Sequence, residues 1–242
     1  MKKQKISSKM AKEDFDFEKY WLAKFSKCLG KIAGEGIHNE IMKGSEEFSD
    51  SSNRKKIIKW SKEAMEKLDS LVDEEKRIEI MTGCACQYPK SNLQEIRKTY
   101  EETKDIDLVH QKLLEKFILF LKDSLKLDDE IVKDIINRGW GLAGVKKGNT
   151  IIATKIPKSG NLTLYMKETN LQKKRTLYCH CPRVRDILKM SDIKLSPTYC
   201  YCGAGFYKGI WEEILKKPVK VEVLKTVVKG DDICQIAIYL PN

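Results

Sequence analysis

The sequence has no hydrophobic run long enough to cross a membrane. The longest apolar stretch, residues 117–121, is flanked by Lys116 and Lys122 and falls well short of the roughly 18 residues that a spanning helix needs. The basic residues 1–5 are followed by a polar and acidic segment, whereas a secretion signal would continue with an apolar one. We therefore expect a cytoplasmic protein that does not contact a membrane.

The short motifs of several enzyme and nucleic-acid-binding classes are also missing. There is no Gly-x-x-x-x-Gly-Lys phosphate loop, no His-Glu-x-x-His and no Gly-x-Ser-x-Gly. Neither zinc-finger spacing nor a helix-turn-helix pattern is present, so we expect no specific nucleic-acid binding. The net charge of +11 nevertheless favours anionic partners.

The chain changes character near residue 140. Before that point, apolar residues recur at helical spacing, and Asp73 and Asp128 are placed to cap helices. After it, the sequence predicts two helices, over 182–188 and 203–216. Extended runs predict strands over 149–156, 161–168, 174–181, 219–228 and 233–240, the last two joined by a turn at Gly230-Asp231.

These patterns predict an α+β fold. We expect an N-terminal helical part, residues 1–140, packed on a C-terminal part, residues 141–242, that holds an antiparallel sheet with one or two helices. No Pro- or Gly-rich linker separates the two parts, so they can share one core. The oligomeric state does not follow from the sequence.

Cysteine is what the sequence has in excess. Six of its eight cysteines form three Cys-x-Cys pairs, which are Cys84/Cys86, Cys179/Cys181 and Cys200/Cys202. In an α-helix, residues i and i+2 lie about 200° apart, whereas in a strand they share a face. The expected backbone is extended or turned at two of the three pairs, and none of the three lies in the middle of a helix, so the pairs are able to present their thiols together.

Clustered thiols in a reducing compartment indicate metal or redox chemistry more often than structural disulfides. The best four ligands are Cys179, Cys181, Cys200 and Cys202, with only 18 residues between the second and the third. Thiolate ligation suits zinc or an iron–sulfur cluster, and the sequence leaves the two open. Cys84 and Cys86 complete this site or form a separate one.

The remaining cysteines and the histidine inside one pair have other expected roles. Cys28 and Cys234 lie on apolar faces and are expected in the core. His180 lies between two thiols, and on a strand its side chain points away from them. We therefore expect it outside their site.

Basic residues gather around the second pair, among them Arg183 and Arg185. They form either a solvated face or a positive rim that lowers thiol pKa values and holds an anionic small molecule. Together with the aromatic residues Tyr201 and Phe206, these two arginines are the predicted ligand-binding residues.

The C-terminal stretch resembles a known family. Residues 201–209, Trp211, residues 218–223 and the Gly230-Asp231-Asp232-Ile233-Cys234 segment are similar to the vinyl-reductase-type (4-vinyl reductase) small-molecule-binding domain. This resemblance covers about a fifth of the chain and implies an α/β ligand-binding fold, used in sensors and enzymes, sometimes with a metal held by cysteines. A thiazoline-carboxylate hydrolase-like family has a similar C-terminal end, which implies an enzyme.

Other segments resemble a different group of proteins. The Cys84-Ala85-Cys86 and Cys179-His180-Cys181-Pro182-Arg183 segments look like an uncharacterised Cys-x-Cys-rich family of anaerobic bacteria. That resemblance carries no function with it.

The leading hypothesis is a cytoplasmic protein that binds a metal and a small molecule through clustered thiolates. One alternative is an enzyme, either a thiol redox enzyme or a metal-dependent hydrolase of a small anionic molecule, and a hydrolase needs an open metal position. Another alternative is a structural zinc module, which unfolds when its metal is removed.

Overall fold

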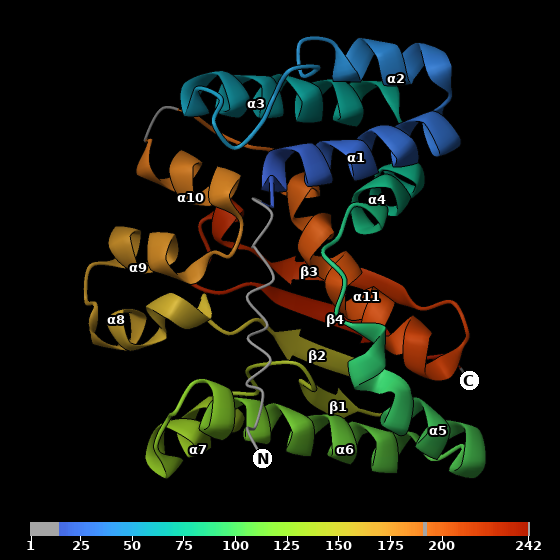
Figure 1. The fold of residues 1–242 in the computed structure, drawn as a ribbon, viewed down its shortest axis with the longest axis vertical. Helices are drawn as coiled ribbons and strands as arrows, with labels where there is room; N and C mark the ends of the chain where they lie inside the picture. The colour runs from blue at the N-terminus through green and yellow to red at the C-terminus, as the bar shows by residue number, and fades with distance from the viewer. Residues whose placement is uncertain (1–14, 191–192, 242) are drawn as a thin grey trace, which may run out of the picture.

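The computed structural model describes residues 15–190 and 193–241, and within them it has eleven α-helices and one four-stranded sheet. Figure 1 shows α1–α4 at one end of the molecule, the sheet and α11 in the middle, and α5–α7 at the other end. This arrangement confirms the predicted α+β class.

Three of the first four helices, α1, α3 and α4, are capped by a side chain that accepts a hydrogen bond from a backbone amide. The remaining one, α2, follows Gly34 and has no such cap. As predicted, Asp73 caps a helix by accepting from the Lys76 amide at 2.9 Å. The helices are α1 (Phe17–Ala33), α2 (Glu35–Met42), α3 (Arg54–Leu71) and α4 (Glu74–Gly83).

The next three helices lie beside the sheet. Asp128 caps the third of them by accepting from the Ile131 amide, again as predicted. Val109 and Leu113 are buried against strand residues such as Ile151, which fixes the middle helix on the sheet. The helices are α5 (Gln94–Thr103), α6 (Ile106–Leu119) and α7 (Asp129–Asn137).

The sheet is antiparallel throughout, with strand order β1-β2-β4-β3. Its central strands, β2 (Thr150–Thr154) and β4 (Gln235–Tyr239), pair in the register Ile152–Ala237. The edge strand β3 (Lys220–Lys225) confirms another prediction, whereas the edge strand β1 (Val145–Lys147) was not predicted.

The turn between β3 and β4 differs from the prediction. In place of a tight hairpin at Gly230-Asp231, a 3-10 turn over Val227–Lys229 leads to Gly230 at φ +96°. Residues 226–234 therefore form a loop, and this loop carries side chains into the site described below.

Two predicted strands are wrong. Residues 161–168 and 174–181 mostly form α8 (Leu162–Lys167) and α9 (Leu171–Tyr178). Leu162 and Tyr165 are both buried, and only helical spacing places residues three apart on one face. Short apolar runs fit either period, and here the tertiary packing decides in favour of helix.

The last two helices confirm the sequence prediction and position the cysteines. They are α10 (Pro182–Lys189), with Pro182 in its first turn, and α11 (Tyr201–Leu215). Ile210, Trp211 and Ile214 of α11 are buried in the same cluster as Ile236 and Ile238 of β4. α11 therefore lies against the sheet, and this packing fixes the position of the first turn of α11.

A second hydrophobic cluster includes residues from both predicted parts, for example Trp21 and Tyr199, whose rings stack at 5.5 Å. The boundary at residue 140 stays a prediction, but the two parts share this core. Among the described residues, no helix combines the length and the apolar character that crossing a membrane requires.

Candidate functional site

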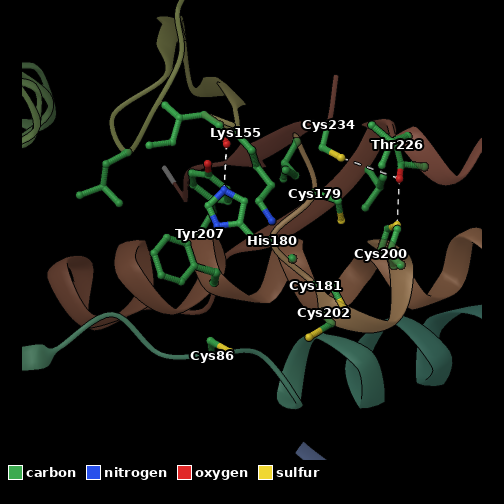
Figure 2. Close-up of a pocket in the computed structure, with 18 of the residues that line it drawn as sticks. Cys86, Lys155, Cys179, His180, Cys181, Cys200, Cys202, Tyr207, Thr226 and Cys234 are labelled. Atoms are coloured by element: carbon green, nitrogen blue, oxygen red, sulfur yellow. Dashed lines mark hydrogen bonds between the residues drawn. The ribbon is translucent and has the colours of Figure 1, made fainter. Parts of the chain in front are cut away.

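Six cysteines line one cavity of about 400 Å³. They come from four chain segments, which are the loop after α4, the link between α9 and α10, the start of α11 and the loop before β4. Figure 2 shows their side chains gathered around the open space. The six are Cys86, Cys179, Cys181, Cys200, Cys202 and Cys234.

The pair predicted on extended backbone has that conformation. Cys179 ends α9 with ψ 134° and Cys181 precedes α10 with ψ 124°, so the link between the helices is extended. Cys200 and Cys202 differ from the prediction, because they lie at the end of a 3-10 turn and in the first turn of α11. Their thiols therefore have different neighbours in the cavity.

One group of thiols surrounds Thr226. The Cys200 Sγ and the Thr226 Oγ1 are 2.8 Å apart, and the Cys234 thiol donates to the same oxygen at 3.9 Å (Figure 2). The Thr226 amide in turn donates to the Asp231 carboxylate at 2.8 Å. The Gly230-Asp231 turn thus supports Thr226, which contacts both Cys200 and Cys234. The sequence predicted Cys234 only as a core residue.

A second group lies on the other side of the cavity. The Cys181 Sγ is 3.2 Å from the Tyr199 hydroxyl. The Cys202 side chain lies beside that of Cys181 (Figure 2). The Cys202 thiol also donates to the Cys84 carbonyl at 3.8 Å. Cys179 lies between the two groups, next to both Cys181 and Cys234.

Burial decides the ionisation of these thiols. It raises the pKa of Cys179 and of Cys202 to about 12, and it raises the pKa of Cys200 well above its ordinary value. Nearby Cys181 adds to the rise at Cys179 and Cys202, while Lys155 opposes it. Without a bound cation, these three side chains are therefore neutral thiols.

Three lysines line the cavity, Lys116, Lys155 and Lys225, and Lys155 is the one that lowers the pKa values of its thiols. The Lys155 Nζ lies close to Gly203, and a Cβ added to that glycine would be 3.3 Å from it. Figure 2 shows the Lys155 side chain pointing toward the thiols. Burial lowers its pKa, but Cys234, Cys179 and other neighbours raise it by more. No carboxylate forms a salt bridge with Lys155 in the part of the chain that the structure describes.

His180 also lines the cavity, contrary to the expectation that it lies outside the site. Its Nε2 donates to the Ile156 carbonyl at 2.9 Å. Burial, with Lys155 adding to it, lowers its pKa to about 4, so the ring is neutral at physiological pH. The bond to Ile156 fixes its orientation.

The four predicted ligand-binding residues do not lie in one place. Phe206 lines the cavity, whereas Tyr201, Arg183 and Arg185 do not. Arg183 is fully buried, forms a salt bridge with Glu18 and lies 4.0 Å from the Trp21 ring centroid. The cavity is instead lined by lysines, of which Lys155 is the one that influences the thiols.

The first Cys-x-Cys pair is split between two environments. Cys86 is exposed at the cavity, whereas Cys84 is buried outside it, within hydrogen-bonding reach of Cys28. That contact, opposed by burial and helped by nearby lysines, lowers the pKa of Cys28 to about 7. The pKa of Cys84 rises well above its ordinary value, because of Cys28 first and burial second.

The cysteine side chains are not arranged as a ready single-ion site. Within residues 15–190 and 193–241, no three Cys, His, Asp or Glu side chains are grouped so that they could hold one metal ion. Five of the six predicted ligands, all except Cys84, line one cavity, but they lie around it and not at one point. Lys155, Thr226 and Cys234 are the site residues that the ligand prediction left out.

Comparisons with known proteins agree with the expected similarity to proteins of unknown function. A family of unknown function (DUF6144) matches residues 145–242, which include the sheet and five of the six cavity cysteines. A 43-residue stretch is 44% identical to an uncharacterised protein of Methanocaldococcus jannaschii.

That stretch is 18% of this chain, and the chain spans 24% of the relative's length. No solved structure matches the chain. The resemblance to the vinyl-reductase-type domain is not among these matches and stays a prediction. The chain is thus similar, over its C-terminal part, to a family of unknown function.

Proposed function

We propose that the cavity binds a metal centre through its cysteines, and that this centre is an iron–sulfur cluster in preference to a single zinc ion. The observation that carries this proposal is the convergence of six thiols, from four chain segments, on one cavity. Cysteine thiolates are the ligands that zinc and iron–sulfur clusters share. Cys179, Cys181, Cys200 and Cys202 are the proposed ligands.

The spacing of the thiols favours the cluster. A zinc ion needs its ligands around one point, at about 2.3 Å from each sulfur, and no such group is present among the described side chains. In a four-iron cluster each cysteine binds a different iron, so the ligands stand farther apart. A cavity of about 400 Å³ with thiols along its walls suits the larger centre.

The charge of the cavity supports the same conclusion. A cluster held by four thiolates has a net negative charge, and burying it requires a compensating cation. Lys155 has its ammonium at these thiols and no carboxylate partner among the described residues. Binding of iron would also displace the protons that burial keeps on Cys179, Cys200 and Cys202.

The alternatives have less support. A thiol redox enzyme needs thiolate nucleophiles, whereas the pKa values of three cavity thiols are raised. A hydrolase needs a zinc ion with an open position, and a structural module needs a closed four-ligand site. Lys155 would also suit a small anionic ligand, which is the second candidate for this cavity. A reducing compartment such as the cytoplasm fits every version that requires free thiols.

The test is the metal content and visible absorption of the protein purified without oxygen. We expect iron and inorganic sulfide, with brown absorption, in the wild type and their loss in Cys179→Ser/Cys202→Ser. Cys28→Ser is the matched control, because this cysteine lies outside the cavity, and it should keep the cluster. Stoichiometric zinc would favour the structural or hydrolytic alternative, and the absence of any metal would overturn the proposal.

A further inference from the structure

A second thiol site lies outside the cavity, between α1 and the end of α4. Cys28 is half-buried on α1, and Cys84 is buried directly after α4, with its thiol donating to the Ile80 carbonyl at 3.0 Å. The two thiols are close enough that each is the largest influence on the pKa of the other. Neither lines the cavity.

The backbone holds this pair close. A Cβ on residue 83 would lie 2.6 Å from the Cys28 Sγ, so Gly83 lets the thiol approach the α4 backbone immediately before Cys84. On the same side, the Lys24 ammonium donates to the Ala85 carbonyl, directly after Cys84. Contacts on both sides of Cys84 therefore fix its distance from α1.

The two cysteines have unequal surroundings. Cys28 is partly accessible, and Lys24, Lys27 and Lys31 of its own helix surround it with positive charge, which favours a thiolate. Cys84 is enclosed, with a relative exposure of 1%, and Cys28 lies beside it. An accessible thiol backed by a buried one is the arrangement of an attacking and a resolving cysteine.

We propose that Cys28 and Cys84 form a reversible disulfide by exchange with a low-molecular-weight disulfide. The Cys28 thiolate attacks one sulfur of that disulfide and releases a thiolate, leaving a mixed disulfide on Cys28. The Cys84 sulfur, after giving its proton to the released thiolate, then attacks the Cys28 sulfur and displaces the second small thiolate, which takes a proton from water or buffer. Both cysteines are oxidised, and the small disulfide is reduced to two thiols.

This site neighbours the cavity without depending on it. The Cys84 carbonyl accepts from the thiol of Cys202, one of the proposed cluster ligands, so a disulfide at Cys84 would alter the support of that ligand. The exchange itself needs no metal centre. Failure of the cluster proposal would therefore leave this one standing, and the reverse also holds.

The test uses glutathione disulfide as the probe on the full chain, followed by alkylation of free thiols and peptide mapping. We expect a Cys28–Cys84 disulfide peptide in the wild type and in Cys86→Ser, which removes the exposed cysteine nearest in sequence. In Cys84→Ser the exchange should stop at one glutathione on Cys28. In Cys28→Ser, Cys84 should stay unmodified.

Two outcomes would overturn the proposal. One is the absence of a Cys28–Cys84 disulfide in the wild type, whether or not Cys28 carries glutathione in Cys84→Ser. The other is a disulfide that joins Cys28 to Cys86, or that forms only among the cavity cysteines. Circular dichroism of each variant confirms that the compared proteins are folded.

Discussion

A Cβ on residue 205 would lie 2.1 Å from the Thr82 carbonyl oxygen, so Gly205 allows α11 to pack directly against the last turn of α4. The same Cβ would lie 2.7 Å from the Thr82 Cα, which is backbone and cannot move aside easily. This contact places the start of α11, with Cys200 and Cys202, beside the loop that carries Cys84 and Cys86. The cavity depends on it.

Gly205→Ala should therefore lower the free energy of unfolding by about 3 kcal/mol, the upper part of the range for overpacking. Gly209→Ala is the matched control on the same helix, because nothing lies within 4 Å of its added Cβ. That control should be neutral or stabilising, by up to about 1 kcal/mol, since alanine favours helix. Urea denaturation measures both, and equal effects would refute the packing argument.

The buried pair of Glu18 and Arg183 gives a second prediction. Both side chains are inaccessible to solvent, and removing Arg183 leaves the buried Glu18 carboxylate with only the partly exposed Arg54 as its ion-pair partner. Arg183→Met should cost about 3–5 kcal/mol in the free energy of unfolding. Arg54→Met, which removes a partly exposed partner of the same carboxylate, should cost about 1 kcal/mol. A smaller loss for Arg183→Met than for Arg54→Met would contradict this role.

Lys155 should tune the electron affinity of the proposed cluster. Removing its positive charge in Lys155→Met disfavours the more negative, reduced state, so the reduction potential should fall. Lys158→Met is the control, since that lysine does not line the cavity. Voltammetry without oxygen measures the reduction potential of both variants. An unchanged potential in Lys155→Met would show that this lysine does not act on the cluster.

Glu213 predicts a pH dependence of stability. Hydrogen bonding to Lys216, with contributions from Lys90, lowers its pKa from 4.5 to about 2. Because the folded-state pKa is the lower one, its stabilisation is present above pH 4.5 and is lost as the pH falls toward 2. Thermal denaturation should give the wild type a higher melting temperature than Glu213→Gln at neutral pH. The difference between the two melting temperatures should shrink as the pH falls from 4.5 toward 2. A constant difference would argue against the ion pair.

The sequence predicted the elements whose local signals agree with their packing. Asp73 and Asp128 cap helices as expected, and β2 and β4 form where extended apolar runs were expected, with Ile151 and Ile236 buried. It failed over 161–168 and 174–181, where short apolar runs fit either period and tertiary contacts decide. β1 was missed because a three-residue edge strand has too little pattern to recognise.

Most of the cysteines that line the cavity were predictable from the sequence, but the residues around them were not. The Cys-x-Cys spacing identified five of the six cavity cysteines. It did not identify Cys234, whose thiol reaches Thr226 only because the loop before β4 returns to α11. Arg183 was misread as a surface cation, since nothing local to it indicates its distant partner Glu18.

X-ray absorption at the iron edge of the protein purified without oxygen tests the central claim most directly. The cluster account predicts iron surrounded by sulfur, with a second shell of iron, and loss of that signal in Cys179→Ser/Cys202→Ser but not in Cys28→Ser. Protein without iron, whether it holds zinc or only eight titratable thiols, would contradict it.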